Sequence, residues 1–91
     1  GTEPDIVVTD VTTTDEEDAV VVAVRNDGTR HRAFTSGRMI VSAEGREEAL
    51  SLAELEPMPT VNVLPGESRR IVLPVELLPF VPDEVAFQFD R

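Results

Sequence analysis

The chain has 91 residues, with 18 acidic and eight basic side chains, a formal net charge of −10 and no cysteine. A chain of this length forms a single domain, and its negative charge disfavours nucleic acid and anionic membranes as partners, because both would repel it. The longest apolar run, at 19–24, is much shorter than the roughly 20 residues of a membrane-spanning helix, so we expect no membrane insertion.

The first four residues are polar and begin with glycine rather than methionine. We interpret residues 1–4 as a tether or a cloning scar, and residues 5–91 as the domain. No repeat, low-complexity tract or internal linker divides these remaining residues.

The first two apolar segments of the domain, at 6–13 and 19–25, predict two strands. Residues 6–13 are almost all β-branched, a composition that suits a pleated, half-buried surface. Residues 19–25 divide by parity into a bulky face and a smaller one, which is typical of a central strand whose bulky side meets a second sheet. The bulky face consists of Val20, Val22 and Val24.

A turn and a further strand follow. The "NDG" at 26–28 predicts the turn, because Asn, Asp and Gly tolerate positive φ. Residues 38–44 alternate as a half-buried strand does, although Ile40 interrupts the polar outward set. Its inward residues are Met39, Val41 and Ala43.

Residues 47–55 are ambiguous. Leu50 and Leu52 alternate as in a strand, but alanine, leucine and glutamate also favour a helix. We favour a short strand here. The two prolines of "EPMP" at 56–59 end either structure, because proline cannot donate to a ladder and restricts the residue before it.

The last third of the chain predicts three strands. "TVNVLPGESRRIVLPVEL" at 60–77 indicates a strand, a turn at Pro65 and Gly66, and a second strand. The inward residues of that second strand are Ile71, Leu73, Val75 and Leu77. Pro74 places it at a sheet edge or at a bulge. "EVAFQFD" at 84–90 predicts the last strand, whose inward residues are Val85, Phe87 and Phe89.

Six or seven short strands with regularly spaced turns and no convincing helix predict an all-β fold, an antiparallel β-sandwich.

Four consecutive acids at 15–18 are a candidate calcium site, with Asp15, Glu16 and Asp18 as ligands. The spacing does not fit an EF-hand loop, because Ala19 and Val20 would occupy its fifth and sixth positions. The alternative is a hairpin tip whose charges protect the following valines from edge-to-edge aggregation. We favour the hairpin tip, because blocks of like charge are usually solvated, and we predict no metal or other cofactor.

His31 is the single histidine of the chain. Asp27, His31 and Ser36 supply the residue types of a hydrolytic triad, but the sequence has no nucleophile motif such as GxSxG. One histidine also cannot form a histidine-rich zinc site. We therefore predict no catalytic residue and no enzymatic activity.

Basic residues cluster around that histidine on an otherwise acidic chain. The candidate interaction residues are Arg25, Arg30, His31, Arg32 and Arg38. Guanidinium groups bind carboxylates and phosphates, so this cluster is a candidate site for a small anion. The alternative, which we favour, is that these arginines pair with acidic side chains on neighbouring strands.

Two stretches resemble bacterial immunoglobulin-like domains: "VVVAVRNDGTRHRAF" at 20–34 and "VLPGESRRIVLPV" at 63–75. Together they are most similar to one domain of the periplasmic pilus-assembly chaperones and their relatives, over roughly residues 6–90. The resemblance implies an immunoglobulin-like sandwich of about seven strands and a periplasmic or cell-surface setting. Those chaperones have two such domains, a basic anchor between them and a strand that pairs with a pilin subunit. Neither the anchor nor that strand is matched to particular positions here.

We therefore expect a non-catalytic interaction or accessory module of a bacterial envelope protein, which binds a protein partner through loops or by adding a strand at a sheet edge. The alternative is a ligand-binding domain, with calcium at 15–18 or an anion at 25–38. The sequence does not determine the oligomeric state.

Overall fold

A computed structural model describes residues 5–14 and 18–89 of the chain. Its strands, in chain order, are β1 (Ile6–Thr14), β2 (Ala19–Asn26), β3 (Arg32–Ala33), β4 (Arg38–Ala43), β5 (Arg46–Ser51), β6 (Asn62–Val63), β7 (Ser68–Pro74) and β8 (Glu84–Gln88). Three short 3-10 helices are η1 (Leu52–Glu54), η2 (Met58–Thr60) and η3 (Val75–Leu77). The described residues contain no α-helix, so the predicted all-β class is confirmed.

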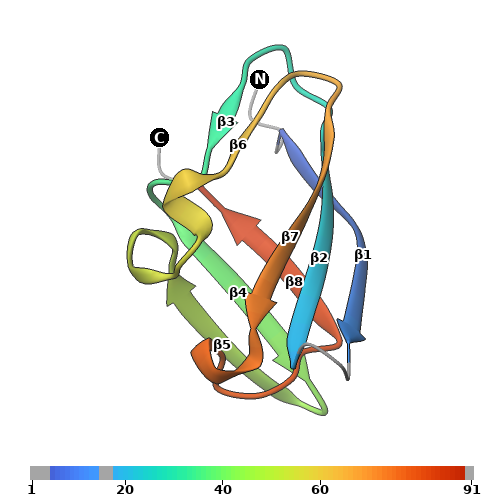
Figure 1. Ribbon diagram of the computed structural model, residues 1–91, viewed down its shortest axis with the longest axis vertical. Helices are drawn as coiled ribbons and strands as arrows, with labels where there is room; N and C mark the ends of the chain where they lie inside the picture. Colours follow the sequence, from blue (N-terminus) through green and yellow to red (C-terminus); the bar gives the residue numbers. More distant parts are fainter. Residues whose placement is uncertain (1–4, 15–17, 90–91) are drawn as a thin grey trace.

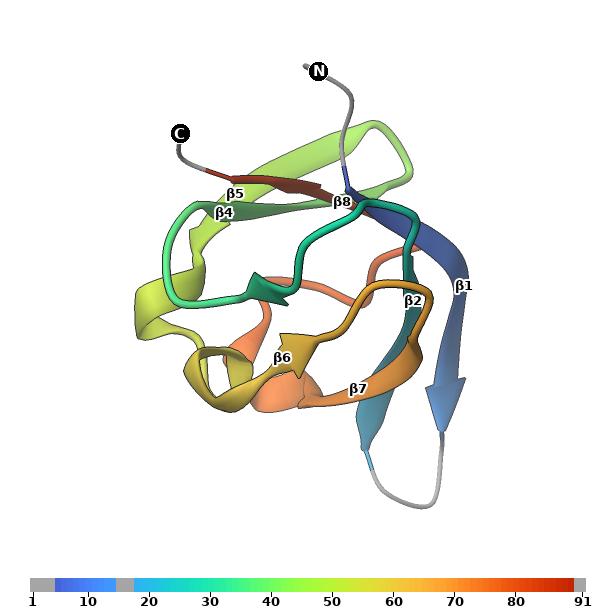
Figure 2. The same ribbon diagram turned by 90° about the horizontal axis from the view of Figure 1, so that it is seen from above.

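The strands form three antiparallel sheets, ordered β1-β2-β7, β5-β4-β8 and β3-β6. The two three-stranded sheets lie as two layers, and the small β3-β6 pair lies toward one open side between them (Figures 1 and 2). The core fills the space between the layers. Its bulkiest fully buried side chains are Phe34, Met39, Leu52, Met58 and Leu73.

Strand β2 is the centre of the first sheet and follows the predicted parity. Val20, Val22 and Val24 are fully buried and belong to the core. Val21 on the smaller face is also buried, and it lies between Thr12 of β1 and Val72 of β7. Neighbours on both sides therefore cover this side chain.

Strand β1 contains a bulge that its sequence pattern did not reveal. The pairing register shifts between Val8 and Asp10, so that Val8 lies opposite Val24 and Val11 lies opposite Val22. In a regular strand, side chains three positions apart point to opposite faces. The bulge places both Val8 and Val11 on the core side.

Two of the predicted boundaries need correction. In the ambiguous stretch 47–55, the favoured strand is present but ends at Ser51, and η1 follows it. Val75 packs against the core as predicted, but the prediction that the strand continues and that Leu77 faces inward was wrong. Pro74 ends β7, and the amide of Val75 donates to the carbonyl oxygen of Asp18 as η3 begins. Leu77 is consequently 41% exposed.

Other predictions about strands agree with the structure. Strand β7 lies at the edge of its sheet, as Pro74 indicated. Met39 and Val41 of β4 are fully buried, and Val85 is buried as well. Phe87 and Phe89 pack against the core from positions that are partly buried.

The "NDG" stretch turns the chain in a different way from the one predicted. The described residues with positive φ do not include Asn26, Asp27 or Gly28. Asn26 is instead the last residue of β2, and its fully buried side chain holds the turn. Its Nδ2 donates to the carbonyl oxygen of Arg30 at 2.8 Å, and its Oδ1 accepts from the amide of Gly28 at 2.8 Å.

Candidate functional site

Arg25, the first of the predicted interaction residues, lies on the outward face of β2 and binds an acidic neighbour. Its Nε and Nη2 donate to the two carboxylate oxygens of Asp27 at 2.6 and 3.0 Å. This two-point contact raises the pKa of Arg25 and, through the hydrogen bond first and the opposite charge as well, lowers the pKa of Asp27. Asp27 is thus engaged by Arg25 rather than by His31.

Arg32 occupies β3 and joins three parts of the chain. Its Nη2 forms an ion pair with Asp5, just before β1. Its guanidinium carbon also lies 4.7 Å from the centre of the Phe89 ring, just after β8. Phe89 in turn meets Phe34 edge to face, with ring centres 5.2 Å apart. These contacts close one end of the core, so the role of Arg32 in the described structure is packing and pairing.

The remaining predicted residues do not form one site with Arg25. Arg30 and His31 are exposed in the loop before β3. Arg38 lies on β4, beside the buried Met39 and therefore on the outward face of the other three-stranded sheet. Ser36 is exposed in the loop before β4. The structure therefore distributes the predicted arginine cluster over both layers, and two of its members pair with carboxylates.

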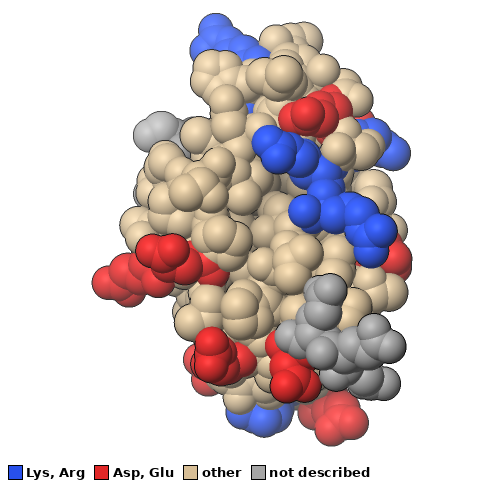
Figure 3. Space-filling view, in the orientation of Figure 1, with Lys and Arg blue, Asp and Glu red and all other residues tan. Residues whose placement is uncertain are grey.

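Arg25 has other basic neighbours that the sequence analysis missed. Strand β7 pairs with β2 so that Ser68 lies opposite Arg25 and Arg70 lies opposite Ala23. We call Arg25 and Arg70 the arginine surface; Arg69 is paired with the buried Val24 and therefore lies on the other face of the sheet. Figure 3 shows basic side chains gathered over β2 and β7, with acidic ones toward the opposite end of the molecule. The sequence contains these arginines in "SRRIV". Only the pairing register of β2 and β7 shows that this stretch lies beside "AVRN".

Carboxylates lie beside the arginines of both faces. Glu67 lies 3.6 Å from the Nε of Arg69, and Asp27 holds Arg25. No ion pair involves Arg70 within the described ranges 5–14 and 18–89. Exposed pairs of this kind contribute little to stability and are screened by salt.

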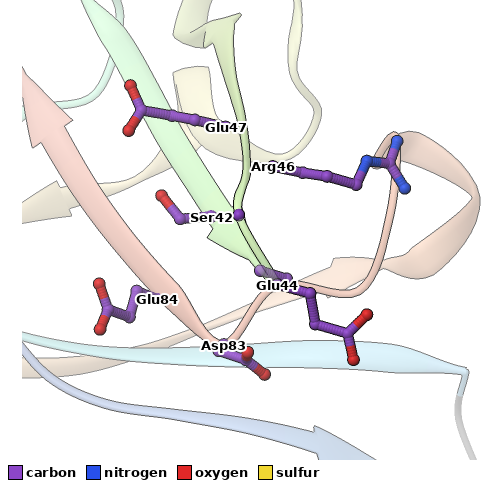
Figure 4. Close-up of a pocket in the computed structure, with 8 residues that line it drawn as sticks. Ser42, Glu44, Arg46, Glu47, Asp83 and Glu84 are labelled. Atoms are coloured by element: carbon purple, nitrogen blue, oxygen red, sulfur yellow. The ribbon is translucent and has the colours of Figure 1, made fainter.

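A shallow pocket lies at the acidic end, between the β4–β5 turn and the start of β8. Figure 4 shows that its carboxylates do not converge: Glu47 and Glu84 point to one side, whereas Glu44 points to the other. Among the residues that the structure describes, no group of three acidic or histidine side chains is placed to hold a metal ion.

The predicted calcium ligands are only partly within the described structure. Asp15 and Glu16 lie outside the described residues. Asp18 is exposed and has a positive φ of 46°, directly before β2. Thr14 and Ala19 are paired at the end of the β1–β2 hairpin, which is where the sequence placed the acids. The calcium hypothesis stays a prediction.

The three-stranded sheets have four edges, and three of them carry features that hinder further pairing. Strand β1 is interrupted by the bulge between Val8 and Asp10. Strand β7 ends in Pro74, and its second and third residues are the exposed Arg69 and Arg70. Strand β5 starts with three exposed charged residues, Arg46, Glu47 and Glu48. Bulges, prolines and charges are the usual means of blocking an exposed strand edge.

The edge of β8 has none of these features. Its pairing with β4 runs without a register shift from Ser42 opposite Glu84 to Arg38 opposite Gln88. Its single charged residue is Glu84, and its inward side chains, Val85 and Phe87, pack against the core. Over the part of the chain that the structure describes, β8 pairs with β4 alone; β1 begins close to its other side but does not pair with it (Figure 2). β8 is therefore the strand edge best suited to receive another strand.

No protein family, curated protein or solved structure matches the chain. A helix long and apolar enough to cross a membrane does not occur among residues 5–14 and 18–89.

Proposed function

We propose that this domain is a non-catalytic protein-interaction module that binds an extended segment of its partner along the unpaired edge of β8. The observation that carries the proposal is the contrast between β8 and the other three edges. Evolution tends to block edges that would otherwise aggregate. A regular edge without a bulge, an internal proline or a cluster of charges is suited to strand addition, in which backbone hydrogen bonds supply the affinity.

The surroundings of β8 also favour an extended partner with alternating apolar side chains. Val85 and Phe87 point to the core, and the partly buried Val8 and Val11 of β1 pack against the same core. An added strand would place every second side chain toward these groups and the others toward solvent. Burial of its apolar side chains would add roughly 25 cal/mol per Å² to the backbone hydrogen bonds.

We extend the proposal to an immunoglobulin-like architecture. If the six longer strands are taken in order, the first, second and fifth form one sheet, and the third, fourth and sixth form the other. Variable-type immunoglobulin domains likewise place the C′ strand, the fourth along the chain, in the sheet of strands C, F and G, and their strand G pairs beside F. The sixth long strand here is β8, so the place of a seventh strand coincides with the unpaired edge. The resemblance of 20–34 and 63–75 to bacterial domains supports an envelope setting, as part of the same proposal.

The absence of cysteine allows a direct test, because any introduced thiol is unique. Gln88 of β8 and Ser51 of β5 are both exposed and lie on either side of Arg38 in the same row of the sheet. A photoreactive crosslinker is attached to Gln88→Cys or, as the matched control, to Ser51→Cys. A library of displayed peptides of about eight residues, the length of a typical added strand, serves as the probe.

Selected peptides should crosslink to the label at position 88 and not to the label at position 51. They should also slow hydrogen exchange at every second amide of β8, those that point away from β4, because an added strand accepts hydrogen bonds from these amides. Crosslinking mainly at position 51, or peptides that protect only the 27–31 loop, would contradict strand addition at β8. Failure to select any extended peptide would contradict it as well.

A further inference from the structure

The outward face of the β5-β4-β8 sheet is a regular grid of nine side chains in three rows. The pairing register defines each row, with one residue from each strand. The first row is Ser51, Arg38 and Gln88; the second is Ala49, Ile40 and Ala86; the third is Glu47, Ser42 and Glu84. We call this surface the outer grid. Nothing among the described residues covers it (Figure 2).

The middle row gives the outer grid a flat apolar centre. Ile40 is half-buried and is flanked by two exposed alanines, Ala49 and Ala86. Ile40 is the residue that interrupted the polar outward pattern in the sequence. Sheets that pack face to face approach to about 10 Å and are aligned to within about 30°, which requires side chains of modest size along the contact. A row of alanine, isoleucine and alanine meets that requirement.

The two outer rows carry opposite charges. The first row has the positive Arg38 at its centre, and the third has Glu47 and Glu84 at its two ends. Figure 4 shows Glu47, Ser42 and Glu84 pointing to the same side of the sheet, away from Arg46. Arg38, Glu47 and Glu84 make no ion pair within the described structure, so their charges remain available.

We propose that the outer grid is a self-complementary surface that binds a second copy of this chain. A two-fold axis lying between the sheets and across the strands would place the first row of each copy on the third row of the other. Each Arg38 would then lie between Glu47 and Glu84 of the second copy, and Ile40 would pack on Ile40. Such an interface is isologous, with every contact made twice.

The charges select this arrangement over its alternative. A two-fold axis parallel to the strands would place each row on its own copy, with Arg38 against Arg38 and the glutamates against glutamates. Like charges in contact are unfavourable, so that arrangement is disfavoured. The net charge of −10 also repels a second copy at long range, but salt screens charges beyond about 8 Å at physiological ionic strength.

The size of the outer grid predicts a weak dimer. Three strands about 4.8 Å apart and about five residues along each, at about 3.4 Å, give a footprint of about 250 Å². A stable complex buries about 800 Å² on each partner. We therefore expect dimers that form with increasing concentration, over a range from about 10 μM to about 1 mM, rather than an obligate assembly.

The sharpest test of the proposed dimer reverses the charges of the outer grid. Analytical ultracentrifugation of the full chain should show an average mass that rises with concentration from the monomer value of 10.0 kDa. Arg38→Glu should abolish this rise, and so should the double variant Glu47→Arg/Glu84→Arg. A mixture of the two should dimerise again, because glutamate at position 38 then meets arginines and the native Arg38 of the double variant meets native glutamates.

Matched variants control for net charge. Arg70→Glu changes the charge as Arg38→Glu does but lies on the other sheet, and Glu48→Arg/Glu76→Arg matches the double variant with exposed residues outside the outer grid. Both controls should still dimerise, because neither changes the outer grid. Any remaining difference from the wild type measures the effect of net charge. Circular dichroism melts check that each variant folds.

A crosslinking experiment does not depend on altered charge. In the proposed dimer Ala86 faces Ala86, whereas Ser51 faces Glu47 of the second copy. A short bifunctional thiol reagent should therefore join Ala86→Cys chains into dimers much more efficiently than Ser51→Cys chains. A mass that stays at the monomer value, dimers that survive Arg38→Glu, a mixture that stays monomeric or equal crosslinking at both positions would each overturn the proposal.

Discussion

Asn26 donates a hydrogen bond from its Nδ2 to the carbonyl oxygen of Val63, at 2.9 Å, across 37 positions of the sequence. The same side chain also binds Arg30 and Gly28, and it is fully buried. Its two N–H donors and its oxygen are thus all used. Asn26 therefore fixes the loop after β2 against β6, the strand that pairs with β3.

Removing the side chain of Asn26 should lower the free energy of unfolding. Asn26→Ala removes the partner of the buried carbonyl oxygen of Val63 and of part-buried backbone groups of Gly28 and Arg30, and a buried loss of this kind costs about 1–3 kcal/mol. We expect a decrease in the free energy of unfolding of about 2–4 kcal/mol, because part of the loss is recovered by relaxation and entering water. Urea denaturation at neutral pH measures it. A loss below about 1 kcal/mol would show that the loop does not depend on Asn26.

Asn26→Asp separates hydrogen bonding from shape. The carboxylate keeps the volume but loses both donors, and it places a negative charge beside two carbonyl oxygens. Burial should raise the pKa of this aspartate above its value of about 3.9 in the unfolded chain. The variant should consequently lose stability as the pH rises through about 4 and recover part of it in acid. Parallel denaturation curves for Asn26→Asp and Asn26→Ala across this range provide the comparison; the same pH dependence in both would exclude a buried charge.

Gly37→Ala should destabilise the end of β8 more than an equivalent change elsewhere. Gly37 has a φ of +99°, and a Cβ there would lie 2.3 Å from the carbonyl oxygen of Gln88 and 2.9 Å from the Cα of Phe89. Gly45 also has a positive φ, of +80°, but a Cβ there meets nothing within 4 Å. Gly45→Ala should cost about 1–2 kcal/mol from backbone strain alone, whereas Gly37→Ala should cost at least about 3 kcal/mol because backbone must also move. Equal melting temperatures for the two variants would contradict the close contact with β8.

The Arg25–Asp27 pair should be visible in the titration of Asp27. The hydrogen bonds from Arg25 lower the pKa of this carboxyl, so the pair contributes stability above the ordinary pKa of aspartate and loses it as the pH falls through the lowered value. Because both groups are exposed, the effect on stability should be small and should weaken with salt. Carboxyl-detected NMR should show the pKa of Asp27 below its ordinary value in the wild type and returned to that value in Arg25→Gln. An unchanged titration in that variant would contradict the pairing.

Calcium provides a test of the acids at 15–18. We expect a hairpin tip rather than a metal site, so about 5 mM calcium should shift the melting temperature by no more than about a degree, because an ion that binds only the folded state must stabilise it. The control melting curves are recorded with the same concentration of magnesium and with a chelator. A rise of several degrees that is lost in Asp18→Asn would establish the calcium site instead.

Much of the strand pattern could be predicted because it depends on local alternation. The parity of Val20, Val22 and Val24 and the burial of Met39 and Val41 needed no knowledge of neighbouring strands. The edge position of β7 followed from Pro74, since proline cannot donate to a ladder.

The features that depend on register could not be found in this way. The bulge in β1 is defined by how Val8 and Val11 pair with β2. The position of Arg70 beside β2, and that of Arg38 away from Arg25, are likewise set by which strands become neighbours. Asn26 looked like a turn residue because its distant partner, Val63, is not apparent from the sequence. Interactions between residues far apart in the chain are thus the part that single-sequence patterns miss.

The uneven distribution of charge on the face in Figure 3 makes the electrostatic field uneven along the molecule, although both signs occur at each end. Arginines gather over β2 and β7, whereas Glu44, Asp83 and Glu84 lie around the opposite end. Such a field orients an approaching molecule before any contact is made, and its influence on the association rate falls with ionic strength. A basic partner would therefore meet the acidic end first, where β8 begins at Glu84, so that its first contact lies at one end of the proposed strand edge.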